Sequence, residues 1–242
     1  MRFGVISDIH GNLEALEAVL VFLKKERIDE VFCLGDTVGY GANPNECIDL
    51  LKATTDRNIA GNHDWAAVGL TDISRFNRFA RAAITWTAQV LTEASKEFLR
   101  GLPLTLVKGE FLFVHGTPSS PASWGYLFDT GDARREFSAF SEKVCFIGHS
   151  HTPLIFAQRP GGFVYKLDFL DHCLEREYQY IINVGSVGQP RDLHPDAAFG
   201  ICDTVKQRFT LTRVPYDIKT AQEKILKAGL PPILAERIEV GQ

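Results

Sequence analysis

The sequence predicts an α/β fold in which two sheets, flanked by helices, lie within one domain. Apolar runs typical of strands alternate with helical patterns over residues 1–60, and a second series of strands begins after residue 100. Such alternation favours parallel strands covered by helices. No Gly/Ser-rich linker separates the two series, and a chain of 242 residues can bury one good core.

The N-terminal part is expected to contain three strands and two helices. Residues 2–7 form a buried strand, and Asn12 caps a helix that runs to about residue 27, with leucines at helical spacing. Residues 30–34 form the second strand. Pro44 stands in the first turn of a helix that continues to about residue 52. Residues 58–60 form the third strand.

A helical insert is expected at residues 65–100. It contains one helix at residues 76–90 and another at 92–100, which Gly101 and Pro103 close. After the insert, strands are expected at residues 105–107, 111–115, 144–147, 163–166, 181–184, 199–203 and 208–214.

The C-terminal part adds few further elements. A helix near residues 130–141 interrupts the strands, and a helical tail, residues 217–242, follows them. The tail holds a helix at residues 217–229, after which Pro231 and Pro232 introduce the end of the chain. Without repeats or linkers, residues 1–242 are interpreted as one domain.

Composition excludes several classes of protein. Hydrophobic residues at 45% and charged residues at 23% are globular values, and no apolar run is long enough for a membrane helix. A net charge of −4 argues against a general binder of nucleic acid or membrane surfaces. It does not exclude an anionic substrate, because bound cations would reverse the local field.

The five cysteines lack CxxC spacing. Cys33, Cys145 and Cys202 lie within apolar runs, so buried free thiols are expected rather than disulfides or zinc ligands. A cytoplasmic location fits free thiols best.

Five short motifs carry the chemistry of this chain, and each follows a predicted strand. In chain order they are Asp8-Ile9-His10, Gly35-Asp36, Gly61-Asn62-His63-Asp64, Val114-His115-Gly116 and Gly148-His149-Ser150-His151. Open α/β sheets place their ligands at the carboxyl ends of strands, so we expect these motifs to meet in space.

The side chains in these motifs suit a metal centre. Carboxylate, imidazole and amide oxygen, without thiolate, favour borderline-hard divalent ions. Two such ions about 3.5–4 Å apart can clamp the attacking and leaving oxygens of a displacement at phosphorus. Taken singly, Asp8 and Asp36 could instead be helix caps, and His115 could be a strand-end histidine bonded to a carbonyl.

Taken together, the motifs resemble those of the calcineurin-like metallophosphoesterase family, and in particular its small bacterial and archaeal phosphoesterases. Order and spacing match over roughly the first 150 residues, and Asn183-Val184-Gly185-Ser186 extends the match to about residue 190. The resemblance implies a four-layer α/β/β/α sandwich of two mixed sheets flanked by helices. It also implies a hydrolase that uses two divalent metal ions.

The resemblance implies a role for each ligand. The first ion is expected on Asp8, His10 and His151, and the second on Asn62, His115 and His149. Asp36 is expected to bridge the ions, because a carboxylate has two oxygens to share. Manganese is the first expectation, and iron, zinc, nickel and cobalt suit the same ligands.

His63 is expected to act in catalysis and not as a ligand. In this family the His of the Asn-His pair faces the substrate and assists the leaving group, while a hydroxide that bridges the metals attacks phosphorus. An imidazole suits this task because its pKa lies near working pH. Asp64 is grouped with His63 as a catalytic candidate that orients the loop.

Arg191 and Tyr40 are the candidates for substrate binding. Arg191 lies in the loop at residues 183–192, which could also be a simple turn, and its guanidinium would match phosphate bidentately. Protein Ser/Thr phosphatases of the superfamily carry Gly-Asp-x-x-Asp-Arg-Gly. Here Gly39 replaces the Asp that orients the catalytic His, and Tyr40 replaces a phosphate-binding Arg. These departures argue against a protein phosphatase.

The expected function is hydrolysis of small phosphomonoesters or phosphodiesters. The alternatives are a non-catalytic metal-binding scaffold of the same fold, or a nucleotidase or protein phosphatase-like enzyme. Such scaffolds typically lose the catalytic His, whereas this chain keeps His63. A small phosphoester is the expected partner, and neither a membrane nor long nucleic acid is expected. Solvated or structural roles are expected for His172, His194, Arg75, Arg78 and Arg81. The substrate itself and the oligomeric state stay open.

Overall fold

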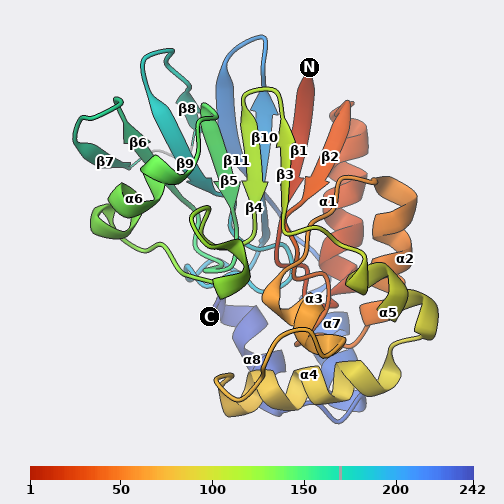
Figure 1. Cartoon of the computed structure of the whole chain (residues 1–242). Helices are drawn as coiled ribbons and strands as arrows, with labels where there is room; N and C mark the ends of the chain where they lie inside the picture. Colours follow the sequence, from red (N-terminus) through yellow and green to blue (C-terminus); the bar gives the residue numbers. More distant parts are fainter. Residues whose placement is uncertain (169–170) are drawn as a thin grey trace.

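Two mixed β-sheets packed face to face form the centre of the molecule, and helices cover their outer faces (Figure 1). The computed structural model describes residues 1–168 and 171–242. The five-stranded sheet contains, in order, β2 (Glu30–Cys33), β1 (Arg2–Ile6), β10 (Ala197–Asp203), β11 (Arg208–Val214) and β8 (Asp171–Cys173). The six-stranded sheet contains, in order, β3 (Thr105–Lys108), β4 (Phe111–Val114), β5 (Val144–Ile147), β9 (Gln179–Asn183), β6 (Leu154–Gln158) and β7 (Val164–Leu167).

Both sheets contain parallel strand pairs. β1 pairs in parallel with β2, and β4 and β9 both pair in parallel with β5. The remaining pairings are antiparallel. In parallel strands the carboxyl ends lie along one edge, so the loops after β1 and β2 emerge together, as do those after β4, β5 and β9.

Phenylalanine side chains fill the space between the sheets. Phe3 and Phe32 come from the five-stranded sheet, and Phe113 and Phe146 face them from the other. The rings of Phe32 and Phe113 stack with centroids 4.1 Å apart, and Phe3 meets Phe146 edge-on at 6.0 Å. Such contacts add to the hydrophobic gain of burying the rings, and they fix how the two sheets sit against each other.

Helices cover the outer faces of both sheets. α1 (Leu13–Lys25) and α2 (Pro44–Thr54) cover the five-stranded sheet, and α6 (Thr130–Glu136) covers the six-stranded one. The side chain of Asn12 accepts from the Ala15 amide at the start of α1, as predicted. The predicted four-layer α/β/β/α sandwich of two mixed sheets is confirmed.

Five helices gather at the carboxyl ends of the parallel strands (Figure 1). The insert supplies α3 (Asn62–Ala67), α4 (Arg78–Val90) and α5 (Glu93–Arg100), and the end of the chain supplies α7 (Ile218–Lys227) and α8 (Pro232–Val240). Buried side chains of α4, α7 and α8 pack together around Tyr40. The insert and the tail therefore form one wall beside the loops that follow β1 and β2.

Some predicted elements differ from the structure. The strand predicted at residues 58–60 is wrong: Asn58 forms a single bridge with Cys33, and the Ala60 amide then donates to the Pro103 carbonyl, so the chain leaves the sheet at once. Strands β6 and β8 and helix α3 were not predicted. α3 begins directly at Asn62 because the Asp64 side chain caps it by accepting from the Gly61 amide.

The ends of two predicted helices also shift. The helix predicted near residues 130–141 ends at Glu136 and continues only as a short 3-10 turn. The Glu136 carboxylate accepts from the amide and hydroxyl of Ser119, which ties the end of α6 to that loop. The tail contains a second helix, α8, which starts at Pro232. In the part of the chain that the structure describes, no helix has the length and apolar character needed to cross a bilayer.

We expect Phe113→Ala to lower the free energy of unfolding by about 3–5 kcal/mol, because it leaves a cavity between the sheets. The side chain of Phe113 is 1% exposed, whereas that of Phe163 is 72% exposed. Phe163→Ala is the matched control and should change stability by less than about 0.5 kcal/mol. Denaturant unfolding followed by circular dichroism measures both. Equal effects of the two substitutions would contradict the assigned inter-sheet core.

Candidate metal centre

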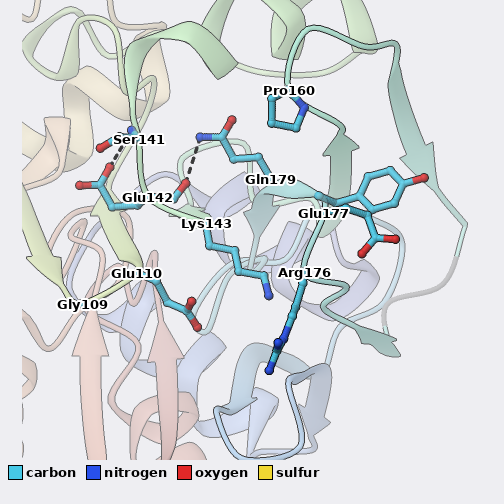
Figure 2. A pocket seen from close by; sticks show the side chains of 10 residues that line it. Gly109, Glu110, Ser141, Glu142, Lys143, Pro160, Arg176, Glu177 and Gln179 are labelled. Atoms are coloured by element: carbon cyan, nitrogen blue, oxygen red, sulfur yellow. Dashed lines mark hydrogen bonds between the residues drawn. The ribbon is translucent and has the colours of Figure 1, made fainter.

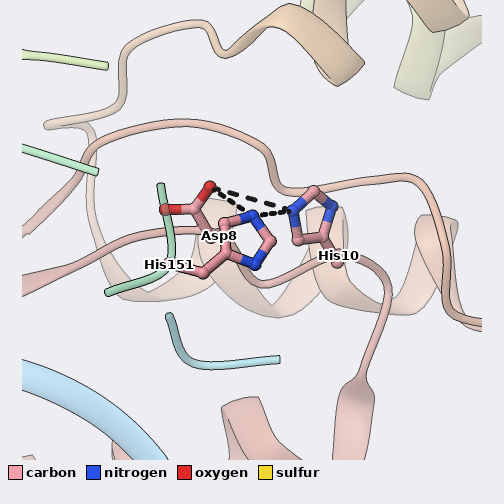
Figure 3. A group of neighbouring side chains, drawn as sticks. All are labelled: Asp8, His10 and His151. Carbon is pink, nitrogen blue, oxygen red and sulfur yellow. Dashed lines mark hydrogen bonds and ion pairs between the residues drawn. The ribbon is translucent and has the colours of Figure 1, made fainter. Parts of the chain in front are cut away.

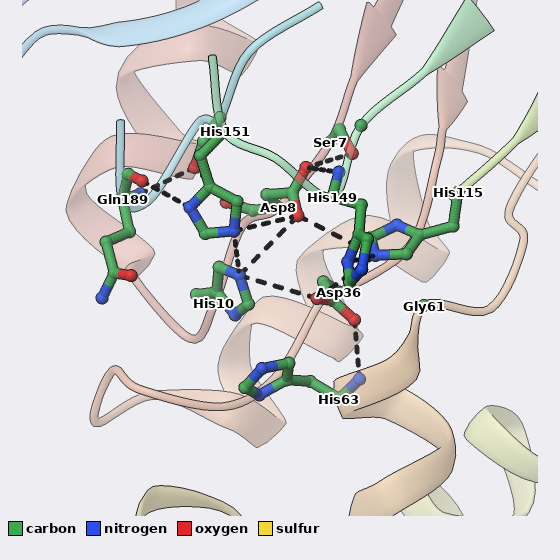
Figure 4. A network of polar contacts seen from close by, with 12 residues as sticks. Ser7, Asp8, His10, Asp36, Gly61, His63, His115, His149, His151 and Gln189 are labelled. Atoms are coloured by element: carbon green, nitrogen blue, oxygen red, sulfur yellow. Dashed lines mark hydrogen bonds and ion pairs between the residues drawn. The ribbon is translucent and has the colours of Figure 1, made fainter. Parts of the chain in front are cut away.

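The loops after four parallel strands meet at one buried point (Figure 4). Asp8 and His10 follow β1, Asp36 follows β2, His115 follows β4, and the Gly148–His151 segment follows β5. The sheets bring together residues that are up to 143 positions apart in the chain (8 to 151). The expected convergence of the motifs at the strand ends is thus present in the structure.

The first group of side chains consists of Asp8, His10 and His151 (Figure 3). The Oδ1 atom of Asp8 lies 3.2 Å from His151 Nε2 and 3.8 Å from His10 Nε2. The two Nε2 atoms are 3.0 Å apart. All three side chains are buried, and their ligand atoms lie within 4.8 Å of one another. They are the three residues expected to hold the first ion.

The second group consists of Asp36, His115 and His149. His115 Nε2 lies 3.3 Å from Asp36 Oδ2 and 3.1 Å from His149 Nδ1. Asn62, expected with this group, begins α3, and its buried amide oxygen has no hydrogen-bond partner among the described residues. An unpaired buried oxygen suits a metal ligand.

Asp36 lies between the two groups. Its Oδ2 atom is 3.7 Å from His10 Nε2 in the first group and 3.3 Å from His115 Nε2 in the second. Its Oδ1 atom accepts from the backbone amide of His63 at 2.8 Å, which holds the carboxylate in place. One carboxylate oxygen is thus placed where it can face both groups.

Each of the four imidazoles is oriented by a backbone carbonyl. The contacts are His10 Nδ1 with the Val38 carbonyl (3.1 Å), His115 Nδ1 with Leu34 (2.7 Å), His149 Nε2 with Trp124 (2.9 Å) and His151 Nδ1 with Gln189 (2.6 Å). A carbonyl only accepts, so in each ring the contacting nitrogen must carry the proton. In the neutral ring the other nitrogen then points its lone pair into the centre, as in metal-bound histidines.

These lone pairs face each other at close range. His10 Nε2 meets His151 Nε2 at 3.0 Å, and His115 Nε2 meets His149 Nδ1 at 3.1 Å. Two lone pairs at this distance repel unless a proton or a cation lies between them. Buried Asp8 Oδ1 has no hydrogen-bond partner in the described part of the chain. The donor set therefore fits divalent cations, and it lacks the thiolate that would favour softer metals.

The pKa values of Asp36 and His115 also show that positive charge is stabilised at this centre. Burial alone would raise the pKa of Asp36, but the neighbouring His115 and His63 hold it well below the usual value. Burial likewise opposes ionisation of His115, yet the Asp36 charge raises the pKa of His115 to about 9. A protonated imidazole thus supplies the positive charge here that a cation would otherwise supply.

The backbone of the centre is held in a sparsely populated conformation. Left-handed φ angles occur at Asp8 (54°), His10 (52°), Asp36 (52°), His149 (67°) and His151 (58°). Each such residue that is not glycine costs on the order of 1–3 kcal/mol. Five of the seven expected ligands share this geometry, so the surrounding sheets must stabilise it.

Gly148 shows how closely the loops pack. A Cβ at this position would lie 2.0 Å from Ser7 Oγ and 2.6 Å from Asp8 Oδ2. That Oδ2 accepts from the Ser7 hydroxyl at 2.6 Å and from the His149 amide at 3.0 Å. Only glycine leaves room for these bonds, which hold Asp8 with its other oxygen facing the histidines.

His63 lies on the first turn of α3, at the edge of the centre. Its ring packs against Tyr40 (centroids 4.6 Å apart), Phe76 (5.2 Å) and His10 (4.9 Å). One of its ring nitrogens also comes within 4.8 Å of ligand atoms of His10 and Asp36. Burial lowers the pKa of His63 to about 4, with Asp36 opposing the shift and Arg191 adding to it.

Gly39 explains how His63 is placed without an orienting carboxylate. A Cβ at Gly39, whose φ is +93°, would lie 2.5 Å from His63 Nδ1. That nitrogen is buried and has no hydrogen-bond partner among the residues described. The His63 ring therefore packs against the backbone of Gly39, and its contacts with the rings of Tyr40 and Phe76 hold it in this position.

Asp64 lies behind the centre. It is fully buried, and its two oxygens accept from the backbone amides of Gly61 (3.0 Å) and Val38 (3.2 Å). Burial and the nearby Asp36 charge raise the pKa of Asp64 to about 7 against these two bonds. Because both oxygens are occupied by backbone, the geometry favours a positioning role that ties two loops together over a direct part in catalysis.

Arg191 and Tyr40 form one side of the centre. The Arg191 guanidinium lies over the Tyr40 ring at 5.7 Å, and its amide donates to the His151 carbonyl at 3.1 Å. Its NH2 group donates to Gln189 Oε1 at 2.7 Å. Arg191 Nε is buried and finds no partner within the described ranges. Tyr40 is 5% exposed and stacks 4.7 Å from His10.

Two aromatic residues of the centre were missed by sequence reasoning. Trp124 supplies the carbonyl that orients His149, and the Tyr126 ring stacks on His149 with centroids 3.9 Å apart. Trp124 has a left-handed φ of 54°, which turns the chain toward the metal loops. The segment lies between predicted elements and carries no motif, so only the folded chain reveals it.

The residues expected to have solvated or structural roles do not belong to the two metal groups. Arg75, Arg78 and Arg81 are exposed on and before α4, His194 is exposed, and His172 lies on β8. Cys33, Cys145 and Cys202 are buried free thiols, as predicted.

A pocket of about 590 Å³ lies at the opposite ends of the strands (Figure 2). It surrounds Lys143, whose Nζ already donates to the Leu174 carbonyl (3.2 Å) and to Gln207 Oε1 (2.9 Å). Its other charged residues are Glu110, Glu142, Arg176 and Glu177. Mixed charges without the histidine cluster give this pocket no comparable chemistry.

The chain matches a known family model. The model of the calcineurin-like phosphoesterase superfamily domain matches residues 1–207. An uncharacterized protein of Methanocaldococcus jannaschii is 40% identical over 243 residues, which cover 99% of this chain and 98% of that protein.

Solved structures agree with the fold. A metallophosphoesterase from Sphaerobacter thermophilus is 38% identical, with a TM-score of 0.87 over 100% of this chain and 99% of its own. A hypothetical protein from Pyrococcus horikoshii gives a TM-score of 0.79 over 100% of this chain and 98% of its own. At 22% identity, the second likeness is one of fold alone.

We expect Asp36→Ala to lower metal content at both groups, because Asp36 Oδ2 faces both. His10→Ala should mainly affect the first group. Elemental analysis after reconstitution with manganese and removal of free metal measures both changes. Asp49→Ala, which changes an exposed aspartate on α2, is the matched control and should keep wild-type metal content. Equal losses in Asp36→Ala and His10→Ala would contradict the bridging position.

Proposed function

The chain belongs to the calcineurin-like phosphoesterase superfamily, and from this premise we propose that it is a dinuclear metal-dependent hydrolase of small phosphomonoesters or phosphodiesters. The observation that carries the proposal is the pair of imidazole contacts, at 3.0 Å and 3.1 Å, on either side of Asp36, in which the ring nitrogens that backbone carbonyls leave free face each other. A site built this way is complete only with cations in it, and phosphoester hydrolysis is the chemistry that such a pair of cations serves.

Two ions would be held by the two groups. Asp8, His10 and His151 would hold one, Asn62, His115 and His149 the other, and Asp36 would be shared. When bound, such ions neutralise phosphate charge and activate water for attack. Manganese is our first choice, since oxygen and imidazole ligands dominate.

The remaining side chains would bind and orient the substrate. Arg191 is the candidate guanidinium, because its Nε is unpartnered among the described residues and its backbone is bonded to His151. Guanidinium matches the geometry of phosphate oxygens. Tyr40 packs between Arg191 and the histidines His10 and His63, so its ring fixes the direction in which Arg191 approaches.

His63 would assist the leaving group through Nε2. Its Nδ1 is buried against Gly39 and has no acceptor among the residues described, so the proton of the neutral ring belongs on Nε2. A neutral imidazole with Nε2–H can donate a hydrogen bond to an oxygen that gains negative charge. The aromatic contacts of Tyr40 and Phe76 keep that nitrogen aimed in one direction.

We expect the manganese-loaded protein to hydrolyse 4-nitrophenyl phosphate or bis(4-nitrophenyl) phosphate, and excess EDTA should abolish the activity because it removes the cations. Nitrophenolate release measures turnover, and adding manganese back is the control for irreversible damage. If the loaded protein hydrolyses neither ester, nor any nucleotide or sugar phosphate in a broad panel, a non-catalytic metal-binding scaffold takes the place of the enzyme.

We expect His63→Ala to lower kcat by about 10²–10⁴-fold on alkyl phosphoesters, which is the usual contribution of general acid catalysis. The loss should be smaller for nitrophenyl esters, because a good leaving group needs little protonation. Steady-state kinetics on both kinds of ester measures the difference. His172→Ala, a half-buried histidine on β8, is the matched control.

Metal content separates two explanations of a loss in His63→Ala. One ring nitrogen of His63 lies within 4.8 Å of ligand atoms of His10 and Asp36, so His63 has to be tested as a ligand. Our assignment requires wild-type metal content in His63→Ala. Loss of an ion in this variant would show that His63 is a ligand.

A further inference from the structure

The C-terminal helix α8 contributes to the wall of the metal centre. Its buried residues Leu234 and Ile238 belong to the same cluster as Tyr40. At its end, the Gly241 carbonyl accepts from the Leu193 amide at 2.9 Å, two residues beyond Arg191. The helix is thus fastened both to Tyr40 and to the loop that carries Arg191.

Arg237 lies on the buried side of α8. Residues 234, 237, 238 and 241 recur at helical spacing, so Arg237 shares a face with buried Leu234 and Ile238. Its side chain is half-buried. Burial, and then the positive charge of Arg191, lower the pKa of Arg237, while Tyr40 acts in the opposite direction.

Among the described residues, neither of the two guanidinium groups has a negatively charged partner. Arginine ion pairs in the described residues involve Arg2, Arg57, Arg135, Arg159, Arg208 and Arg213, but neither Arg191 nor Arg237. Arg191 Nε is buried without a partner in that same part of the chain. Two like charges at a partly buried wall of a chain with net charge −4 are unfavourable unless an anion joins them.

The position of the pair relates it to the substrate. Arg191 bonds through its backbone to His151 in the first metal group, and Tyr40 stacks on His10 of the same group. Arg237 lies on α8, and the buried residues of that helix belong to the same cluster as Tyr40. Tyr40 is thus in contact both with His10 of the first metal group and with the helix that carries Arg237.

We infer that Arg237, together with Arg191 and Tyr40, forms a second anion subsite that selects small phosphoesters carrying a further phosphate or carboxylate group. The inference rests on the proposed function, because the scissile phosphate is taken to lie at the metal centre. Guanidinium groups bind either anion, since carboxylate and phosphate both offer a pair of oxygens that can accept two parallel N–H···O bonds. The tyrosine hydroxyl adds a neutral donor.

The test uses three phosphonates, which resist hydrolysis, built on the same two-carbon chain. Ethylphosphonate has no second anion, 3-phosphonopropionate adds a carboxylate, and ethylene-1,2-diphosphonate adds a second phosphonate. Dissociation constants are measured by calorimetry on manganese-loaded wild type and on the variants Arg237→Gln, Arg237→Lys and Arg100→Ala. Arg100 is exposed at the end of α5 and is the matched control.

In the wild type and in Arg100→Ala, at least one of the two probes with a second anionic group should bind about tenfold to a hundredfold more tightly than ethylphosphonate. This factor corresponds to the usual strength of hydrogen bonds to charged groups. The better probe identifies the second anion as carboxylate or phosphate. Arg237→Gln should lose most of this advantage, and Arg237→Lys should keep part of it. Thermal unfolding checks that the variants fold, and Arg237→Lys keeps the comparison if Arg237→Gln does not.

Failure of the subsite and failure of the enzyme are distinguishable. Equal affinity for all three probes in the wild type, or an advantage that survives in Arg237→Gln, would overturn the subsite even if the protein hydrolyses phosphoesters. An advantage that depends on Arg237 in a protein without any esterase activity would support the subsite and count against the proposed reaction. Binding is measured without turnover, so neither result depends on the other.

Discussion

The structure depends on the burial of two carboxylates, Asp8 and Asp36, among imidazoles whose lone pairs already point inward. Backbone carbonyls occupy the outer nitrogens of the four histidines, so the inner nitrogens cannot all carry protons. Buried negative charge and facing lone pairs are expensive unless positive charge lies between them. In the protein alone, protonation of His115 supplies part of that charge, since Asp36 raises the pKa of His115 to about 9. Divalent cations satisfy the same demand with better geometry, because each can take several of these atoms at once.

Rigid sheets are what keep this arrangement from relaxing. Five expected ligands have left-handed backbone angles. The free-energy cost of these angles is not offset by local sequence preferences, so it must be offset by the surrounding fold. The stacked phenylalanines between the sheets hold β1 and β2 against β4 and β5, and so hold the four ligand loops at fixed separations. Close packing at Gly148 and the two backbone bonds of Asp64 lock those loops together. Strain of this kind is common where a protein prepares a site for a ligand before binding it.

Sequence reasoning found the centre but not its surroundings. Asp8, His10, Asp36, His115, His149 and His151 were predictable because each directly follows a strand, and parallel strand ends must meet. The strand predicted at residues 58–60 failed because a short apolar run does not reveal that Ala60 bonds to Pro103 in place of a neighbouring strand. Trp124, Tyr126 and Arg237 were missed because nothing local marks them. They reach the site only through tertiary packing of a loop and of the last helix. The aromatic support of His63 was likewise invisible, although Gly39 signalled that the usual carboxylate was missing.

The most direct test is the position of bound metal. Crystals of the protein grown with manganese can be measured at the manganese absorption edge, where anomalous difference density marks each ion. Two peaks about 3.5–4 Å apart are expected, one beside Asp8, His10 and His151 and the other beside Asn62, His115 and His149, with Asp36 touching both. A single peak, no peak, or ions bound away from these residues at saturating manganese would contradict the dinuclear centre.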